Sequence, residues 1–203
     1  MRKIFVTGIG TDVGKTVVSA ILVEALKADY WKPVQAGTYY ATDSEKLKKL
    51  ISNDKTVVHP ETYKLREAMS PHAAAEAEKI TIDFDKINLP QTNNTLVIEG
   101  AGGLMVPLNE KYFMLDLIKK FDAEVIVVIQ NYLGSINHSL LTIDTLKQRG
   151  IKIIGLVFNG HPHPLSKEII LSYSKLPFIC WINKENEINK DVILKYVKDF
   201  QNI

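Results

Sequence analysis

The clearest chemical signal in the sequence is a glycine-rich segment from Gly8 to Thr16, which reads Gly-Ile-Gly-Thr-Asp-Val-Gly-Lys-Thr. It separates a short apolar run from an amphipathic one, a pattern that predicts a loop between a strand and a helix. Glycines in such a loop let backbone N–H groups surround phosphate oxygens, and the helix N-terminus adds a favourable dipole. We expect Lys15 to contact the outer phosphates of a nucleotide and the Thr16 hydroxyl to bind Mg²⁺.

The spacing of this loop is unusual, because five residues rather than the common four separate Gly8 from Gly14. A plain glycine turn between a strand and a helix is the alternative interpretation. The Gly-Lys-Thr sequence at the start of a helix favours phosphate binding. Nucleotide binding is therefore the first functional prediction.

Two acidic residues, Glu99 and Asp43, stand next to predicted elements, and one of them is placed where a metal ion bound to phosphate would need a ligand. Glu99 ends the apolar run Thr95–Ile98 and precedes a glycine-rich stretch, Gly100–Gly103. This places it at the carboxyl end of a buried strand and makes it a candidate metal ligand, with turn capping as the alternative. Asp43 precedes an amphipathic segment, and from its spacing alone a helix N-cap is the favoured role.

Lys32 is unusual because it lies inside a short apolar run, Tyr30–Val34. A lysine there is costly unless it pairs with an anion. A ligand-binding role and an edge position with the side chain extended to water both remain open. His161 and His163 alternate with prolines and have no acidic or thiol neighbour, so we interpret them as part of a structural loop.

Short β-branched runs alternate with longer amphipathic segments along the chain, which is typical of parallel strands joined by crossover helices. Strands are expected near Lys3–Thr7, Tyr30–Val34, Thr95–Glu99, Glu124–Gln130, Ile151–Phe158 and Phe178–Ile182. Helices are expected near Lys15–Ala28, Asp43–Ser52, Phe113–Phe121, Asn137–Arg149, Pro164–Ser174 and Asp191–Phe200. The strands lack polar alternation, so helices should cover both faces of the sheet. The predicted fold class is α/β, a doubly wound, mostly parallel sheet of the P-loop NTPase type.

The stretch from Asn53 to Asn94 is the least regular part of the chain, with prolines at 60, 71 and 90 and one short helical pattern near Ala73–Lys79. A length of 203 residues fits one domain better than two. We expect a single domain over residues 1–203, with this stretch as an elaboration of it.

The composition of the chain limits which binding partners and which cellular compartment can be expected. A net charge of +2 gives no reason to expect nucleic acid, and the longest apolar runs fall far short of the roughly 20 residues that cross a bilayer. The single cysteine, Cys180, excludes an internal disulfide and a cysteine-based zinc site. No apolar signal segment precedes the first predicted strand. We expect a cytoplasmic protein without a membrane or nucleic-acid partner.

Taken together, the motifs resemble those of the dethiobiotin synthetase family over nearly the whole chain. The resemblance rests on an ordered set: Gly8–Thr16, Tyr30-Trp31-Lys32-Pro33-Val34-Gln35, Ser70-Pro71-His72, Glu99-Gly100-Ala101-Gly102-Gly103, Leu133-Gly134-Ser135-Ile136-Asn137-His138, and Asn159 after its strand. Any one of these could arise by chance, but the ordered set argues for the family.

The resemblance implies a role for each candidate residue. Lys15 and Lys32 correspond to the two catalytic lysines, and Thr16, Asp43 and Glu99 to the Mg²⁺ ligands, which raises Asp43 above a helix cap. Nucleotide contacts are expected from Asp12, Val13, Gly14, Lys15, Thr16, Val17, Asp43, Glu99, Gly100, Ala101, Gly102 and Asn159. Substrate contacts are expected from Thr11, Lys32, Ala36, Gly102, Leu133, Gly134 and Asn137.

By the same resemblance, the reaction uses ATP and Mg²⁺ to join CO₂ to 7,8-diaminononanoate. One amine carries CO₂ as a carbamate, the carbamate oxygen attacks the γ-phosphate, and the second amine displaces phosphate to close the ring. Neither step needs a protein nucleophile, so positioning and cations should supply the catalysis. The family also implies a homodimer, with Gly134–His138 at the interface.

Two departures from the family pattern bear on ligand contacts. Ala36 stands where the family usually has a hydroxyl residue that contacts the substrate, with Thr38 two residues later. The segment that cradles the nucleotide base reads Pro177-Phe178-Ile179-Cys180-Trp181-Ile182-Asn183, without the family's glycine and final proline. We therefore expect weaker discrimination among bases, so that other nucleoside triphosphates besides ATP are accepted.

Two other functions compete with this interpretation. An amidotransferase-like ligase of the same superclass would need a glutaminase domain with a nucleophilic cysteine, whereas Cys180 lies in an apolar run. A nucleotide-switch or partitioning ATPase that acts by dimerisation usually has a second lysine near the start of its phosphate loop, where this chain has Gly8-Ile9-Gly10.

Overall fold

The computed structural model describes residues 1–39 and 41–203, and parallel strands form its centre. Seven strands make one sheet in the order β4-β2-β6-β1-β7-β8-β9, and every neighbouring pair is parallel. They are β1 (Lys3–Gly8), β2 (Asp29–Trp31), β4 (Val58–His59), β6 (Leu96–Gly103), β7 (Glu124–Gln130), β8 (Ile153–Asn159) and β9 (Phe178–Ile182). A second, two-stranded sheet pairs β3 (Val34–Ala36) with β5 (Tyr63–Leu65).

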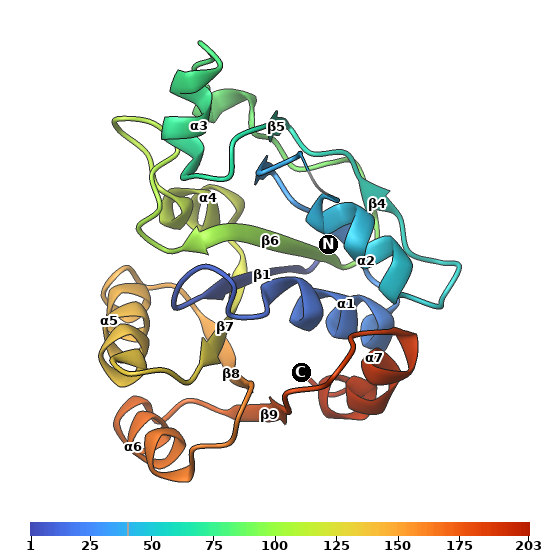
Figure 1. Cartoon of the computed structure of the whole chain (residues 1–203), viewed down its shortest axis with the longest axis vertical. Helices are drawn as coiled ribbons and strands as arrows, with labels where there is room; N and C mark the ends of the chain where they lie inside the picture. The colour runs from blue at the N-terminus through green and yellow to red at the C-terminus, as the bar shows by residue number, and fades with distance from the viewer. Residues whose placement is uncertain (40) are drawn as a thin grey trace.

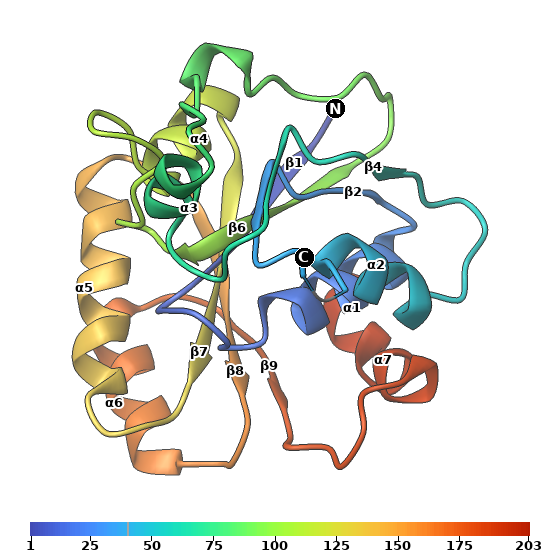
Figure 2. The same ribbon diagram turned by 45° about the horizontal axis from the view of Figure 1, so that its top comes forward.

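Helices cover both faces of the large sheet, as its apolar strands require. They are α1 (Lys15–Leu26), α2 (Asp43–Leu50), α3 (Pro71–Ala77), α4 (Met114–Phe121), α5 (Ser135–Gln148), α6 (Pro164–Ser174) and α7 (Lys190–Tyr196), with 3₁₀ turns η1 (Phe84–Lys86) and η2 (Val197–Phe200). Helices α1, α2 and α7 lie on one side of the sheet and α5 and α6 on the other (Figures 1 and 2). Most residues of the central strands β1, β6, β7 and β8 are buried between them.

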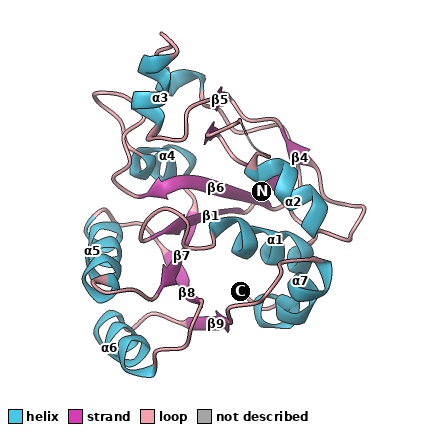
Figure 3. Cartoon of the chain, viewed as in Figure 1, coloured by secondary structure: helices cyan, strands magenta, loops and turns pink. Residues whose placement is uncertain are grey.

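The order of the strands determines where a ligand can bind. The connection after β1 passes through α1 towards β2, whereas the connection after β7 passes through α5 towards β8, on the other side of β1. The chain therefore diverges at the carboxyl ends of the central strands (Figure 3). Ligands in open parallel sheets bind at such a switch point, and the loop after β1 carries the glycine-rich segment.

The predicted α/β fold is confirmed, and the boundaries of β7, β9 and α6 are the predicted ones. The predicted strand Tyr30–Val34 is wrong as one element, because β2 ends at Trp31 and β3 begins at Val34. Pro33 has no N–H to donate to a ladder, and its carbonyl accepts hydrogen bonds from Thr62 and Tyr63. The chain changes sheets at this point.

Other boundaries differ in ways that affect the site. β6 continues to Gly103, so Glu99 lies inside the strand rather than at its end. α5 begins at Ser135 instead of Asn137, and the predicted final helix divides into α7 and η2. The short strands β4 and β5 fall in the irregular stretch from Asn53 to Asn94, and β4 joins the main sheet. Within the described residues, no helix combines the length and the apolar character needed to cross a membrane.

A buried carboxylate on α1 anchors the segment after α2. Glu24 is 2% exposed and accepts hydrogen bonds from the backbone N–H groups of Ser52 (2.9 Å) and Asn53 (3.2 Å), from both of their side chains, and from Lys27 Nζ (2.8 Å). Burial alone would raise the pKa of Glu24, but these hydrogen bonds outweigh it and lower the pKa to about 2. The ionised form is therefore part of the folded state.

This pKa predicts a pH dependence of stability. Because the folded pKa lies below the ordinary value of 4.5, the stabilisation by Glu24 is present above pH 4.5 and is lost as the pH falls towards 2. Urea unfolding at pH 7 should show Glu24→Gln less stable by about 2–3 kcal/mol, and the difference should shrink at pH 3. Glu187→Gln, at an exposed position, is the control. An equal deficit at both pH values would contradict this account.

Candidate active site

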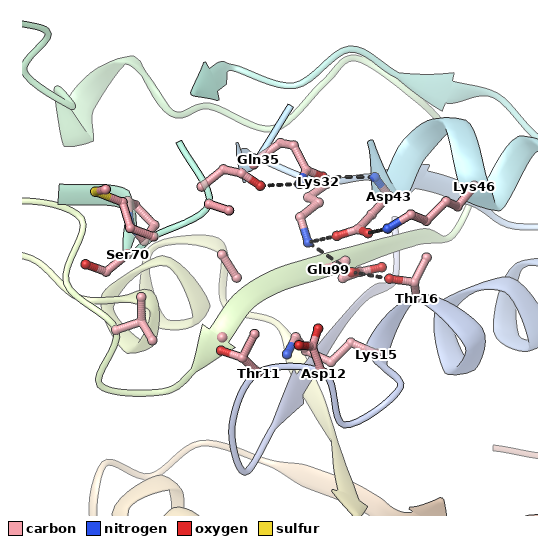
Figure 4. A pocket seen from close by; sticks show the side chains of 18 of the residues that line it. Thr11, Asp12, Lys15, Thr16, Lys32, Gln35, Asp43, Lys46, Ser70 and Glu99 are labelled. Carbon is pink, nitrogen blue, oxygen red and sulfur yellow. Dashed lines mark hydrogen bonds and ion pairs between the residues drawn. The ribbon is translucent and has the colours of Figure 1, made fainter. Parts of the chain in front are cut away.

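The carboxyl ends of β1 and β6, the start of α1 and residues from 32–37 and 41–46 enclose a cleft of about 720 Å³ (Figure 4). Most of the predicted site residues come together there. The cleft is lined by Thr11, Asp12, Gly14, Lys15, Thr16, Val17, Lys32, Ala36, Asp43, Glu99, Ala101 and Gly102, and on its far side by Ser70. Val13, Gly100 and Asn159, which are neighbours of the lining residues, and Leu133, Gly134 and Asn137, which come from the loop before α5, do not line the cleft.

The glycine-rich loop has the backbone shape that its glycines permit. Gly14 forms the N-cap of α1 with φ of 99°, a left-handed conformation that favours glycine. A Cβ on Gly8 would come within 2.4 Å of Val13 Cγ2. Lys15 Nζ donates to the carbonyl of Gly10 at 2.8 Å, and burial lowers the pKa of Lys15 to about 8, although Glu99, Asp43 and Asp12 partly oppose this.

Asn159, at the end of β8, supports this loop from behind. Its Nδ2 donates to the carbonyl of Val13 at 2.9 Å. A Cβ on Gly14 would lie 2.2 Å from the same Nδ2. Asn159 thus fixes the turn that leads into α1, and its contact with Gly14 leaves no room for a side chain.

Glu99 is the centre of the polar network. Its carboxylate is buried, and its Oε1 accepts hydrogen bonds from Thr16 Oγ1 (2.9 Å) and Lys32 Nζ (3.0 Å). Its Oε2 accepts one from the Tyr30 hydroxyl at 2.9 Å. Burial, followed by the charge of Glu99, raises the pKa of Tyr30 well above its usual value, so the hydroxyl remains a donor.

Lys32 lies between two carboxylates, which settles one of the open interpretations. Its Nζ is 2.7 Å from Asp43 Oδ2 and 3.0 Å from Glu99 Oε1 (Figure 4). At 3% exposed it does not extend to water, so the edge position is wrong. Burial favours the neutral amine, but the charges of Glu99 and Asp43 outweigh it and raise the pKa of Lys32. The lysine is a buried cation.

Asp43 is not the N-cap of α2, contrary to the role that its spacing favours. Thr42 is the cap: its side chain accepts from the N–H of Glu45, and the Glu45 side chain accepts from the N–H of Thr42 at 2.9 Å. The carboxylate of Asp43 is therefore free to face Lys32. Burial raises the pKa of Asp43, but the charge of Lys32 outweighs it and the net shift is downward.

Three residues of the network have no predicted role in the sequence, although Tyr30 and Gln35 belong to one of the motifs shared with the family. Gln35 accepts a hydrogen bond from the N–H of Asp43 at 3.0 Å, Lys46 Nζ lies 3.3 Å from Asp43 Oδ1, and Tyr30 holds Glu99. The (i, i+3) spacing of Asp43 and Lys46 is a signal that could have been used. Tyr30 and Gln35 resemble ordinary core and loop residues in sequence.

The donor set fits a hard divalent cation. The carboxylates of Asp43 and Glu99 converge on one cationic group, and the Thr16 hydroxyl contacts Glu99. Among the described residues, there is no cluster of three or more His, Cys, Asp or Glu side chains suited to a metal. Mg²⁺ is commonly bound by one or two carboxylates together with phosphate oxygens and water, so two carboxylates and one hydroxyl are sufficient.

The loop before α5 lies outside the cleft. Leu133, Gly134 and Asn137 are exposed, and Gly134 is the N-cap of α5 with φ of 99°. A second hollow of about 470 Å³, lined by Thr11, Tyr132 and residues of α5, separates this loop from the phosphate loop. The three predicted substrate residues are therefore not joined to the cleft within one chain.

Most of the segment Pro177–Asn183 forms the strand β9. None of its residues lines the cleft, as far as the structure describes the chain. Trp181 stacks on Phe158 with ring centroids 5.2 Å apart and donates Nε1–H to the carbonyl of Gly160 at 2.8 Å. Cys180 is buried, which raises the pKa of its thiol to about 12. A thiol in this state is a poor nucleophile.

Sequence comparisons give close relatives over the full chain. The model of a family described as AAA domain matches residues 2–192. The ATP-dependent dethiobiotin synthetase of Cytophaga hutchinsonii is 51% identical over 204 residues, covering 100% of this chain and 98% of that protein. The enzyme of the same name from Christiangramia forsetii is 50% identical over 200 residues, covering 98% and 96%, respectively. The enzyme of that name from Chlamydia pneumoniae is 40% identical over 207 residues, covering 100% and 91%.

Solved structures share the fold at low sequence identity. A plasmid partition protein of Borrelia burgdorferi superposes with a TM-score of 0.60 at 12% identity, covering 99% of this chain and 96% of that one. The septum site-determining protein MinD of Pyrococcus horikoshii gives a TM-score of 0.56 at 15% identity, covering 99% and 96%. At such identities the likeness establishes the fold alone.

The tight packing of Gly14 against Asn159 generates a prediction for the loop. Gly14→Ala should weaken ATP binding by at least about tenfold, since the added Cβ strains the backbone and must displace Asn159 Nδ2, which holds the carbonyl of Val13 in the loop. Isothermal titration with ATP and Mg²⁺ checks this. Gly150→Ala is the matched control, because Gly150 also has a positive φ (68°) but an added Cβ meets nothing within 4 Å. Equal ATP affinity in the two variants would refute the prediction.

Proposed function

The chain belongs to the dethiobiotin synthetase family, and from this premise we propose how its residues carry out ATP-dependent dethiobiotin synthesis. The enzyme is a ligase of biotin biosynthesis that uses ATP. We take residues 1–203 as one catalytic domain. Its co-substrates are 7,8-diaminononanoate and CO₂, and its products are dethiobiotin, ADP and phosphate.

One observation supports the proposal above the others: the buried carboxylate of Glu99 bridges the phosphate loop and Lys32. Thr16 and Lys32 donate to the same oxygen of Glu99, at 2.9 and 3.0 Å. The phosphate end of a nucleotide bound at Thr16 would then lie on one side of the Glu99 carboxylate, and the buried cation of Lys32 on the other. This arrangement suits a transfer in which a phosphoryl group passes between two bound molecules.

Residues of the phosphate loop are assigned to the nucleotide. Backbone N–H groups from Asp12 to Val17 would surround its phosphates at the start of α1, and Lys15 would contact the outer phosphates. Gly100, Ala101 and Gly102 would border it from β6, and Asn159 would keep the loop in shape. Thr16, Asp43 and Glu99 would hold Mg²⁺, which when bound neutralises phosphate charge and orients the oxygens.

Lys32 is assigned to the reacting end of the substrate. One amine of the diamine adds to CO₂ and loses a proton, giving a carbamate. A carbamate oxygen then attacks the γ-phosphorus as ADP leaves, and the second amine attacks the carbamoyl carbon as phosphate leaves. Lys32 and Lys15 stabilise the anionic oxygens in these steps. Thr11, Ala36 and Gly102, which line the same cleft, would border the diamine.

A homodimer would complete the substrate site. Leu133, Gly134 and Asn137 are exposed beside the second hollow, and Leu133 is an apolar side chain that is fully exposed at a helix start. We propose that the partner copy covers this loop, so that these residues reach the neighbouring cleft. The use of ATP and a single buried thiol fit a cytoplasmic enzyme.

The partitioning-ATPase alternative is supported only by shared fold. The partition and MinD structures are 12–15% identical to this chain, whereas the dethiobiotin synthetases reach 51% over its full length. The cleft also contains the buried Lys32, which contacts the carboxylates of Asp43 and Glu99. A protein that only switches between nucleotide states would not need this second lysine.

The direct test of the proposal is product formation. Wild-type protein with 7,8-diaminononanoate, bicarbonate, Mg²⁺ and ATP should give dethiobiotin, detected by mass spectrometry. Lys15→Ala and Lys32→Ala should each reduce the rate about 10²-fold or more. Lys32→Ala should also lose about 3 kcal/mol or more of stability, because it leaves the buried carboxylate of Glu99 without a cationic partner. Near-normal synthesis by Lys32→Ala would refute its catalytic role.

The matched control for the stability loss is Lys46→Ala. Lys46 pairs with the same Asp43 carboxylate, but its side chain is 55% exposed. Exposed ion pairs contribute about 0–1 kcal/mol, so this variant should melt close to the wild type. A similar loss in both variants would show that burial of Lys32 is not the cause.

The altered segment at β9 generates a prediction about the nucleotide base. Cys180 and Trp181 occupy positions in a packed strand, so we expect few backbone contacts to shape a base pocket there. Specificity constants for ATP, GTP and CTP at equal Mg²⁺ should differ by no more than about 200-fold, the limit for pockets without matched hydrogen bonds. A preference for ATP above roughly a thousandfold would contradict the prediction.

A further inference from the structure

Tyr30 is a fully buried tyrosine whose hydroxyl faces the candidate metal site. It lies on β2, next to β6, where the parallel register pairs Tyr30 with Val97. Val97 and Glu99 are two residues apart on one strand, so their side chains share a face of the sheet. The tyrosine ring therefore runs along that face, and its hydroxyl reaches Glu99 Oε2 at 2.9 Å.

The three donors to Glu99 differ in their surroundings. Thr16 and Lys32 both donate to Oε1, and both line the cleft where nucleotide and substrate would meet them. Tyr30 does not line the cleft, and within the described residues it is the only hydrogen-bond donor to Oε2. Its contact can therefore persist when ligands enter, whereas the other two donors gain new partners.

The hydroxyl of Tyr30 contributes a hydrogen bond to Glu99 rather than packing in the core. Its ring occupies a fully buried place in the core, which the ring of phenylalanine would fill equally well. A buried hydroxyl needs a hydrogen-bond partner, and here the partner is Glu99. The extra oxygen thus serves the carboxylate rather than the packing.

We propose that Tyr30 is a positioning residue for the divalent cation, which holds Oε2 of Glu99 and keeps Oε1 turned towards Thr16 and the cleft. This inference rests on the proposed function, in which Glu99 is a metal ligand. A group that fixes a metal-binding carboxylate from behind commonly changes metal affinity by about 10–100-fold when it is removed. The effect should appear only when the metal is present.

The experiment compares nucleotide affinity with and without metal in Tyr30→Phe. The affinity for a non-hydrolysable ATP analogue is measured by isothermal titration, once with Mg²⁺ and once with EDTA. In Mg²⁺ the variant should bind about tenfold more weakly than the wild type, while in EDTA the two should bind alike. The affinity in EDTA also reports that the variant is folded. Electron paramagnetic resonance of bound Mn²⁺ should show a changed signal.

Control variants separate this inference from a general effect on packing. Tyr63→Phe removes a hydroxyl that binds the backbone of Asp83 away from the cleft, and it should leave both affinities unchanged. When Glu99→Gln is already present, adding Tyr30→Phe should not further reduce the gain in nucleotide affinity that Mg²⁺ produces. Equal losses in Mg²⁺ and EDTA, or no loss in either, would overturn the inference.

The same measurements distinguish an error in the proposed metal role of Glu99 from an error in the role of Tyr30. If Glu99→Gln alone leaves the contribution of Mg²⁺ unchanged, then Glu99 is not a metal ligand and the metal assignment is wrong. If Glu99→Gln weakens the Mg²⁺-dependent affinity and Tyr30→Phe does not, only the role of Tyr30 is overturned.

Discussion

A carboxylate buried inside a parallel sheet is tolerated only when donors or cations surround it, because an unpaired buried charge costs several kcal/mol. Glu99 is 1% exposed, and three elements supply its partners. Thr16 comes from the start of α1, Tyr30 from β2, and Lys32 from the segment after β2. Satisfying this one charge therefore fixes the phosphate loop, the neighbouring strand and the second lysine relative to one another. Asp43 completes the set by sharing Lys32.

The local structure around Glu99 shows how the sequence meets this constraint. Lys32 can turn towards the carboxylates because Pro33 ends the hydrogen-bond ladder of β2 and lets the chain pass to a second sheet. Asp43 can face Lys32 because Thr42 caps α2 in its place. In the function that we propose, the carboxylates that hold Lys32 would also bind Mg²⁺ together with the Thr16 hydroxyl, a donor set that suits this ion. Metal binding and substrate activation would share one network.

Strong local patterns predicted much of the fold. The apolar run of β7 and the proline-started helix α6 have the expected boundaries because burial and chain geometry act over neighbouring residues. The strands β4 and β5 were missed because two or three residues carry too little periodicity. The burial of Lys32 could not be deduced from its own segment, since its partner Glu99 is 67 residues away. Tyr30 shows the same limit: its sequence context is that of a core aromatic, and only the register of β2 on β6 reveals its partner.

In the function that we propose, the polar network around Glu99 couples ATP cleavage to ring closure of the diamine. In a nucleotide switch, ATP would instead be cleaved without a second substrate. Phosphate release from ATP by the wild-type protein, measured with and without 7,8-diaminononanoate and bicarbonate, tests this coupling most directly. Release should be slow with ATP and Mg²⁺ alone and should increase greatly when diamine and bicarbonate are added, with one phosphate for each dethiobiotin formed. The same rate of release with and without the diamine would contradict this coupling.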